Sequence, residues 1–305
     1  MKKVILIKNN KGGIGKTFIA VNLADYLSQV KVNGRDSKVL ILTDDSQNNV
    51  LLYAKREKEV EKENKRLELI DENMKYDLNY SLENEGFSDD IKIKENISFI
   101  PFSNAGLSNY ANKNLAKWIE LIKHNYDFIV VDSNPSLQSL EFMKHCEYWI
   151  APTEPTQASI EALYETVGYV GADKLIAILP NKIRENNLHK TMEKYIKEQV
   201  REALLQAGTD KNLLILNGIR TSTEYERLHF DGKTVTDLTA KGNEMQNDLN
   251  YTFFRLAERI IEKMVVDNKG TDYKFNEKTL LRNKNLIMKN EGMKTLQEFE
   301  EKYLK

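Results

Sequence analysis

Short apolar runs recur along this chain and alternate with stretches of helical periodicity. The runs lie at residues 4–7, 39–42, 97–100, 128–131, 148–150, 175–179 and 213–216. Continuous apolar runs of this kind are typical of strands that a sheet buries on both faces. Between and after them, residues 17–30, 108–123, 157–170, 188–206 and 246–266 are expected to form helices. Strands that alternate with helices favour right-handed crossovers, so we expect an α/β fold with a mostly parallel sheet flanked by helices.

The prolines support this assignment. Of the five prolines, Pro101, Pro135, Pro152 and Pro180 each follow a predicted strand within a few residues. These positions are the carboxyl ends of the strands, which is the edge where open α/β sheets bind ligands. The sequence therefore places its candidate site along that edge.

Two regions differ from the alternating pattern. Residues 54–76 are nearly all charged and are expected to form a solvated helix, either a plain surface helix or an arm that binds a partner. Residues 267–305 are polar and are expected to end in a short helix near 293–304. We therefore expect one domain over residues 1–266, with a charged helical insert at 54–96, followed by a C-terminal extension.

Composition excludes few classes of protein. The 305 residues are 41% hydrophobic, with 45 Lys+Arg against 46 Asp+Glu, so any affinity for DNA must come from a local basic surface. The one cysteine, Cys146, cannot form an internal disulfide. No apolar run approaches the ~18 residues of a membrane span, and a strand with a glycine-rich turn stands where a signal peptide would be cleaved. A cytoplasmic protein is expected.

A glycine-rich turn lies between the first predicted strand and the first predicted helix. It reads Lys11-Gly12-Gly13-Ile14-Gly15-Lys16-Thr17, followed by Phe18. Glycines let main-chain N–H groups approach phosphate oxygens, and the helix N-terminus adds positive partial charge. Lys16 can reach the terminal phosphates, and the Thr17 hydroxyl can bind Mg²⁺. The residues expected to bind a nucleotide here are Lys11, Gly12, Gly13, Ile14, Gly15, Lys16, Thr17 and Phe18.

The turn departs from the usual Gly-x-x-x-x-Gly-Lys-Ser/Thr loop in a specific way. Asn10 replaces the first glycine, and Lys11 is a second lysine inside the loop. This resembles the deviant P-loop, Lys-Gly-Gly-x-Gly-Lys-Thr/Ser, of the ParA/MinD family of ATPases. The resemblance implies Mg²⁺-dependent ATP hydrolysis and a homodimer that forms with ATP, in which Lys11 contacts the phosphates of the other subunit. The alternative is that Lys11 stays in its own subunit as a solvated charge.

Two further segments resemble the family's motifs. Thr43-Asp44-Asp45-Ser46-Gln47-Asn48-Asn49 is similar to the switch segment Asp-x-Asp-Pro-Gln-x-Asn, with Thr43 and Ser46 as departures and Asp44 as an extra acid that could compensate. The resemblance implies that Asp45 positions the attacking water and approaches Mg²⁺. The alternative is that Asp44 and Asp45 only end a strand as turn residues.

The other segment is the run from Tyr126 to Leu137, an apolar strand that ends in Asp132. It resembles the family's Tyr-Asp-x-Ile-x-Ile-Asp-x-Pro-Pro-Ser-Leu, with Asn134 in place of the first proline. Asp132 is expected to hold Mg²⁺ through water. Asn181, after a later predicted strand, is a weaker candidate for reading the adenine edge, because an amide can both donate and accept.

Within the family, the sequence most resembles the short ParA-type partition ATPases. That resemblance implies non-specific binding of the ATP dimer to double-stranded DNA and a centromere-binding ParB-type adaptor that stimulates hydrolysis, with nucleoid association in the cytoplasm. The candidate phosphate contacts are Lys190, Lys194, Lys197, Arg201, Arg220, Arg227 and Lys233.

Two other branches remain alternatives. A MinD-like membrane or cargo-positioning ATPase would need an amphipathic C-terminal helix, but Glu298, Glu300 and Glu301 lie among the apolar residues of the last segment. A metabolic or redox enzyme of the same fold would need cysteine ligands for a shared iron–sulfur cluster, and the single cysteine disfavours it.

Overall fold

The computed structural model describes residues 1–53, 78–83, 91–102, 108–136, 140–222, 228, 231–238 and 244–304. Its strands are β1 Val4–Ile7, β2 Val30–Val32, β3 Arg35–Asp36, β4 Val39–Thr43, β5 Ile91–Lys94, β6 Ile97–Ile100, β7 Phe128–Asp132, β8 Tyr148–Thr153, β9 Leu175–Pro180, β10 Leu214–Ile215 and β11 Tyr273–Phe275. Its α-helices are α1 Lys16–Leu27, α3 Leu78–Glu83, α4 Asn109–Ile122, α5 Leu140–His145, α6 Gln157–Val170, α7 Asn187–Tyr195, α8 Arg201–Gln206, α10 Glu244–Asp267, α11 Glu277–Glu291 and α12 Leu296–Tyr303. A π-helical segment, Ile196–Val200, joins α7 to α8, so the helix predicted at 188–206 forms in three pieces.

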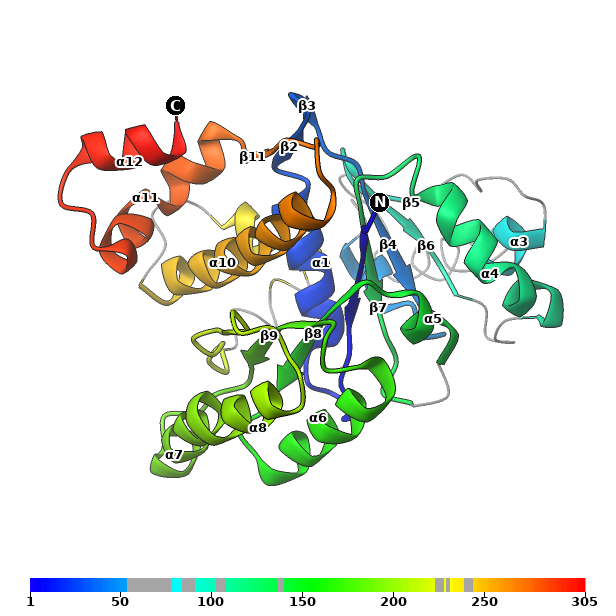
Figure 1. The fold of residues 1–305 in the computed structure, drawn as a ribbon, viewed down its shortest axis with the longest axis horizontal. Helices are drawn as coiled ribbons and strands as arrows, with labels where there is room; N and C mark the ends of the chain where they lie inside the picture. Colours follow the sequence, from blue (N-terminus) through cyan, green and yellow to red (C-terminus); the bar gives the residue numbers. More distant parts are fainter. Residues whose placement is uncertain are drawn as a thin grey trace.

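An eight-stranded sheet forms the centre of the molecule, in the order β10-β9-β8-β1-β7-β4-β6-β5 (Figure 1). Its neighbouring strands run parallel, except that β5 pairs antiparallel with β6. This confirms the mostly parallel α/β fold. Because β1, β7 and β4 are neighbours in this order, the segments that follow them meet at one edge of the sheet. That edge carries the glycine-rich turn and both acidic segments.

Side chains alternate across the sheet and build two cores. Along β1, Ile5 and Ile7 belong to the core that α1 and α10 cover, whereas Val4 and Leu6 belong to the core beneath α4 and α6. All four side chains are fully or almost fully buried. Burying such a side chain contributes about 1.5–3 kcal/mol each, so the continuous apolar runs are the main source of the fold's stability.

A second, small sheet joins the C-terminal extension to the N-terminal part of the chain. The helix predicted over 17–30 ends at Leu27, and Val30 begins β2, which pairs antiparallel with both β3 and β11. The Phe275 ring lies 4.8 Å, centroid to centroid, from the Phe254 ring of α10. Phe299 of α12 is fully buried in the same core as α1. The predicted terminal helix forms, but the extension also contributes β11 and α11, which the sequence did not predict.

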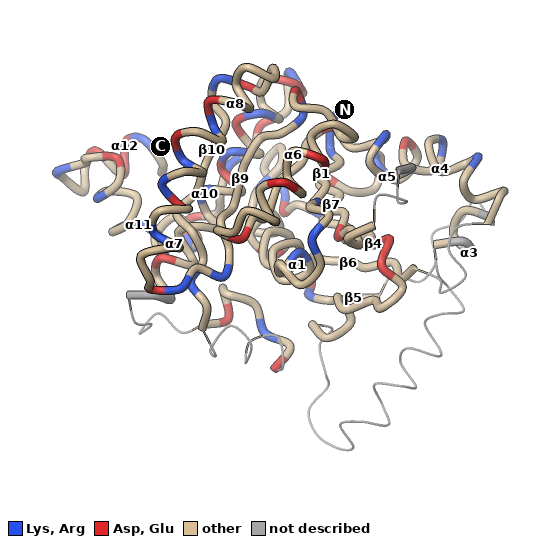
Figure 2. Tube along the Cα trace, turned by 90° about the horizontal axis from the view of Figure 1, so that it is seen from below, with Lys and Arg blue, Asp and Glu red and all other residues tan. Residues whose placement is uncertain are grey.

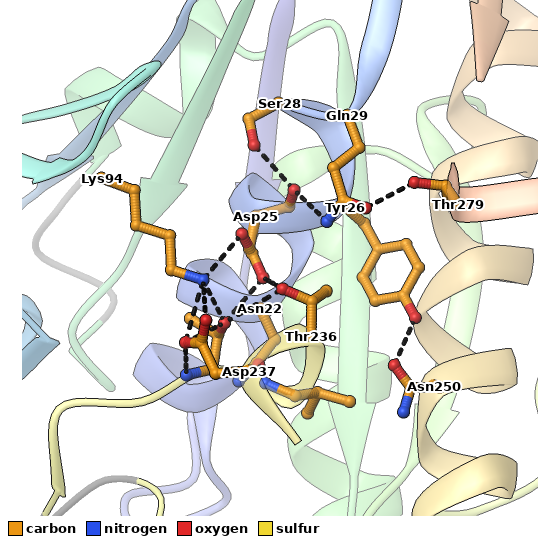
Figure 3. Close-up of polar contacts among 12 residues, drawn as sticks. Asn22, Asp25, Tyr26, Ser28, Gln29, Lys94, Thr236, Asp237, Asn250 and Thr279 are labelled. Atoms are coloured by element: carbon orange, nitrogen blue, oxygen red, sulfur yellow. Dashed lines mark hydrogen bonds and ion pairs between the residues drawn. The ribbon is translucent and has the colours of Figure 1, made fainter. Parts of the chain in front are cut away.

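A turn late in the chain holds α1 near its C-terminal end (Figure 3). Asp25 of α1 is buried and accepts hydrogen bonds from the Thr234 hydroxyl (2.7 Å) and from the Thr236 hydroxyl. The Lys94 ammonium lies 3.1 Å from the Asp25 carboxylate and also pairs with Asp237. This cluster, which we call the Asp25 cluster, joins α1, β5 and the turn around 234–237, so it fixes the helix that begins at the glycine-rich loop.

Some sequence predictions cannot be compared with the structure. The charged segment 54–76 and Arg227 lie outside the described residues. Within the described ranges, no helix combines the length and apolar character that crossing a membrane requires.

Candidate functional site

The loop after β1 needs glycine at two positions. Gly13 and Gly15 have φ angles of 71° and 84°, where side-chain-bearing residues are strained. A Cβ on Gly15 would also lie only 2.6 Å from the Asn181 amide nitrogen. Gly15 is the N-cap of α1, and no side chain caps this end of the helix. The helix therefore presents main-chain N–H groups to an anion, as the sequence predicts.

Lys16 lies folded over its own loop. Its ammonium donates to the main-chain oxygens of Lys11 (3.0 Å) and Asn9 (3.3 Å), and the residue is 7% exposed. Burial lowers the pKa of Lys16, whereas the nearby carboxylates of Asp132, Asp44 and Asp45 raise it. Among the described residues this buried cation bonds main-chain carbonyls, and it is well placed to take phosphate oxygens instead, because a bond between two charged groups is stronger than one to a neutral carbonyl.

Lys11 pairs within its own chain. Its ammonium contacts the Glu154 carboxylate and lies 3.4 Å from the Thr156 hydroxyl, which caps α6. Lys182 lies 3.8 Å from the other carboxylate oxygen of Glu154. Lys11 is therefore a partly exposed charge that pairs with a carboxylate of its own chain, and whether it acts across a dimer stays a prediction.

Thr17 and Asp132 come together at the edge of the sheet. The Thr17 hydroxyl donates to Asp132 Oδ2 at 2.7 Å. Asp132 is 2% exposed, and its second oxygen, Oδ1, has no hydrogen-bond partner among the described residues. Burial raises the pKa of the Asp132 carboxyl to about 7. A buried carboxylate oxygen without a donor is costly unless a cation or its bound water takes it, so the pair fits Mg²⁺.

The donor set also matches how Mg²⁺ is held in proteins. Within the described ranges, no group of three or more His, Cys, Asp or Glu side chains could hold a metal by itself. Mg²⁺ needs no such cage, because it keeps several waters and binds one or two carboxylates together with substrate phosphates. Thr17 and Asp132 are residues that could hold it here.

Asp45 lies beside this pair and is half-buried. Its carboxylate accepts the main-chain N–H of Gln47 at 3.0 Å, and its own N–H donates to the Thr43 hydroxyl at 3.0 Å. Thr43 in turn donates to the main-chain oxygen of Asp132 at 2.9 Å. The threonine that replaces the family's first aspartate therefore ties the Asp45 segment to β7.

Asn181 and Phe18 take positions that the sequence did not foresee. The Asn181 side chain donates to the main-chain oxygen of Ile14 at 2.7 Å and accepts from the Lys182 N–H at 2.9 Å. Asn181 thus braces the glycine-rich loop, and adenine recognition by it stays a prediction. The Phe18 ring packs edge-on against Phe253, 5.9 Å between centroids, so its side chain faces the core.

Sequence reasoning missed two charged residues of this edge. Lys8 is fully buried directly after β1, and Glu154 follows β8 and holds Lys11. The available signal was position: both are charged residues that directly follow, or nearly follow, an apolar strand at its carboxyl end. Open α/β sheets bind their ligands at the carboxyl ends of the strands, so a charged residue at this position is a candidate site residue.

Five of the described candidate DNA contacts have an acid or a carbonyl nearby. The pairs are Lys194 with Glu198 (3.9 Å), Lys197 with Glu193 (2.9 Å), Arg220 with Glu185 (2.6 Å) and Lys233 with Asp231 (3.5 Å), while Arg201 donates to the Lys211 oxygen. Figure 2 shows basic and acidic positions interspersed along α7 and α8. Exposed ion pairs of this kind are worth about 0–1 kcal/mol, so they leave the cations exchangeable.

Comparison with known proteins adds three findings. A family model described as an AAA domain matches residues 2–178. The uncharacterized protein MJECL24 of Methanocaldococcus jannaschii is 28% identical over 282 residues, which cover 86% of this chain and 99% of that protein.

The fold is similar to solved structures as well. A putative plasmid partition protein from Borrelia burgdorferi B31, bound to AMPPNP, has a TM-score of 0.61 at 21% identity, covering 86% of this chain and 100% of that one. The septum site-determining protein MinD from Pyrococcus horikoshii OT3, complexed with Mg-ADP, has a TM-score of 0.57 at 17% identity, covering 88% of this chain and 100% of that one.

Proposed function

Because the chain belongs to the AAA-domain family of ParA/MinD-type P-loop ATPases, we propose that it is a Mg²⁺-dependent ATPase of the DNA-partition kind. The observation that carries the ATPase proposal is the buried carboxylate of Asp132, with one oxygen on the Thr17 hydroxyl and the other without a donor among the described residues. It lies beside an uncapped helix N-terminus and a lysine that bonds only its own loop. Together these groups suit a triphosphate with its cation.

In this proposal each residue has a role that its position supports. Lys16 leaves its main-chain partners and neutralises the terminal phosphates. Thr17 and Asp132 would hold Mg²⁺, which would supply positive charge to neutralise the phosphates. Asp45, half-buried at the same edge, orients the attacking water and accepts its hydrogen bond. Gly13 and Gly15 keep the loop free of side chains, so main-chain N–H groups reach the phosphates.

Lys11 is proposed to act on the nucleotide of a second subunit. Its side chain is 30% exposed and pairs with Glu154, so its ammonium can exchange one anion for another. A second cation at the transferred phosphoryl group stabilises the charge that develops there. ATP would then hold a homodimer together, and hydrolysis would release it.

The DNA proposal rests on the continuous segment α7–α8. Lys190, Lys194, Lys197 and Arg201 recur along it at intervals of three and four residues, across the π-helical segment Ile196–Val200. Arg220, Arg227 and Lys233 are the remaining candidates. Phosphate contacts by such cations give non-specific, salt-sensitive affinity. A centromere-binding adaptor of the ParB type is the proposed partner that stimulates hydrolysis.

The membrane alternative is weaker, because α12 already uses its apolar side inside the protein. Phe299 is fully buried, and Tyr303 bonds Glu291 and Glu258. Among the large apolar residues between 295 and 304, Leu296 and Leu304 are exposed. A helix that lies on a membrane needs its whole apolar face free.

Co-sedimentation with random-sequence duplex DNA and, in parallel, with anionic liposomes tests the proposal. The protein is measured without nucleotide, with ADP, and with ATP and Mg²⁺, each at two salt concentrations. We expect ATP-dependent pelleting with DNA alone. The triple variant Lys194→Ala/Lys197→Ala/Arg201→Ala should flatten the dependence of log K on log salt by up to about 3.

The matched control changes three exposed lysines of the C-terminal extension, Lys274→Ala/Lys278→Ala/Lys289→Ala, and should leave DNA binding unchanged. Binding to liposomes alone would favour the alternative of a MinD-like, membrane-associated ATPase. Binding to neither would contradict the partition proposal and point to a protein cargo or a small molecule.

A further inference from the structure

Lys8 is a buried lysine at the carboxyl end of β1 that the proposed mechanism leaves unused. Its exposed fraction is 0%, and its ammonium donates to the main-chain oxygens of Asn134 and Ser136, both at 2.7 Å. Burial lowers the pKa of Lys8 to about 8, opposed by the nearby Asp44 carboxylate. A buried ammonium without acceptors is strongly unfavourable, so the two contacts of Lys8 fix the position of the loop after β7.

Asn134 connects that loop to the segment after β4. Its main-chain N–H donates to Asp44 Oδ1, and its side-chain amide donates to the Asp44 main-chain oxygen at 2.9 Å. Its side-chain oxygen accepts the Ser136 N–H at 2.7 Å. A proline at this position, as in the motif that the segment resembles, could make none of these three bonds.

The two connected segments carry the two acids of the proposed mechanism. Asp132 lies two residues before Asn134, and Asp45 directly follows Asp44. The Thr43 hydroxyl also connects the two segments, because it donates to the Asp132 main-chain oxygen. The separation of the water-positioning acid from the metal-holding acid is therefore set by bonds that pass through Asn134 and Asp44.

We infer that Lys8, Asn134 and Asp44 form a positioning clamp that sets Asp45 relative to Asp132 during ATP hydrolysis, an inference that rests on the proposed ATPase function. Lys8 fixes the loop after β7 by its two carbonyl contacts, and Asn134 transmits that position to the segment after β4. In this inference the three are positioning residues. They act through the residues beside them, so their loss should slow turnover more than it weakens binding.

The chain supplies a matched control on the same strand. Lys3 lies at the amino end of β1, is also buried, and also donates to two main-chain oxygens, those of Lys123 (2.7 Å) and Tyr126 (2.8 Å). It is far from the site along the strand. Lys3→Met and Lys8→Met therefore remove the same kind of buried interaction from opposite ends of β1.

The experiment measures MgATP turnover, KM and Tm for the full chain and for Lys8→Met, Lys3→Met, Asn134→Ala and the double variant Lys8→Met/Asn134→Ala. We expect Lys8→Met and Asn134→Ala each to lower kcat at least 10-fold with KM within 3-fold, and the double variant to lose little more than either. Lys3→Met should lower Tm but keep kcat within 2-fold. Wild-type kcat in both Lys8→Met and Asn134→Ala would overturn the clamp, as would equal kcat losses in Lys3→Met and Lys8→Met.

A second readout separates this inference from the ATPase proposal. If the unmodified protein does not hydrolyse ATP, the proposed function fails, and hydrogen exchange of the nucleotide-free protein then decides on the clamp. Exchange should be faster in peptides covering 39–50 and 128–136 for Asn134→Ala and Lys8→Met than for Lys3→Met. Unchanged exchange in both peptides would overturn the clamp.

Discussion

The two ends of α1 bury polar groups in opposite ways. Near its C-terminal end, Asp25 receives two hydroxyl donors and an ammonium, and the main-chain N–H of Val235 donates to Asn22 at 2.7 Å (Figure 3). At its N-terminal end, the helix has no side-chain cap, and Asp132 Oδ1 and both polar side-chain atoms of Asn10 have no partner among the described residues.

The difference separates a structural cluster from a site. Buried polar groups in proteins are almost always hydrogen-bonded, so a fully bonded cluster needs nothing further to explain it. A buried carboxylate oxygen left without a donor needs a ligand, a cation or a water. One helix thus has a finished end that holds it in the fold and an open end that fits a nucleotide with Mg²⁺.

Removing the Lys16 ammonium at the N-terminal end of α1 should have the largest effect on ATP turnover. Lys16→Ala should lower ATP turnover at least 100-fold, because the terminal phosphates lose their charged partner. The Tm should change little, since the Lys16 ammonium bonds only main-chain oxygens of its own loop. Steady-state turnover and thermal unfolding measure the two effects. Turnover within a few-fold of the unmodified protein would remove Lys16 from the site.

Breaking the finished end should instead affect stability. Asp25→Ala leaves the Thr234 and Thr236 hydroxyls and the Lys94 ammonium without their shared acceptor, so the free energy of unfolding should fall by about 3 kcal/mol. The KM for MgATP should stay within a few-fold in the folded fraction. Urea unfolding measures the loss, with Asp36→Ala on exposed β3 as the control, expected within about 0.5 kcal/mol. A neutral Asp25→Ala would mean that the cluster is not a structural anchor.

Lys11 lies at the N-terminal end of α1 and differs from the other groups there, because it is paired with Glu154 and is still proposed to be functional. Lys11→Ala should change nucleotide affinity of the monomer less than about 3-fold and should abolish the dimer that forms with AMPPNP and Mg²⁺. Light scattering after size exclusion measures the dimer. Lys182→Ala, which removes the other cation near Glu154, is the control and should still dimerise. A Lys11→Ala protein that dimerises with nucleotide would show that Lys11 stays in its own subunit.

The sequence predicted the centre of the fold because its strands are continuous apolar runs. The seven predicted strands all form in the main sheet, although the run at 213–216 yields only Leu214–Ile215. It missed β5, because Ile91–Lys94 lies within the segment 54–96 that was expected to be a helical insert. It also failed on β2, β3 and β11, which have two or three residues each, at least one of them exposed. Their pairing joins residues far apart in the chain, such as Val32 with Tyr273, and local pattern carries no trace of it.

For the site, motif spacing was enough to bring Lys16, Thr17, Asp45 and Asp132 to one edge of the sheet. Motif spacing could not predict the hydrogen-bond partners of the residues that differ from the family's motifs. Thr43 and Asn134 differ from the family's residues, and only the structure shows that each bonds the neighbouring segment. Lys8 was missed for the same reason, since a lysine after an apolar run reads as the end of a strand until its acceptors are known.

Asp132 gives the most direct test of the contrast between the two ends. Its pKa of about 7 lies above the ordinary 3.8. Between these values the folded protein keeps a proton that the unfolded chain loses, so this group destabilises the nucleotide-free fold as pH rises and does so fully above pH 7. Asp132→Asn removes that cost and keeps an acceptor for Thr17.

The decisive measurement is thermal unfolding of the unmodified protein and Asp132→Asn at pH 5 and pH 8, each with and without Mg²⁺ and ADP. At pH 8 without ligand, Asp132→Asn should melt at least about 3 °C higher, and the difference should shrink at pH 5. Mg²⁺ should add to the stabilisation by ADP in the unmodified protein only. An Asp132→Asn variant that melts lower at pH 8 and still gains from Mg²⁺ would contradict the assignment of the open end as the cation site.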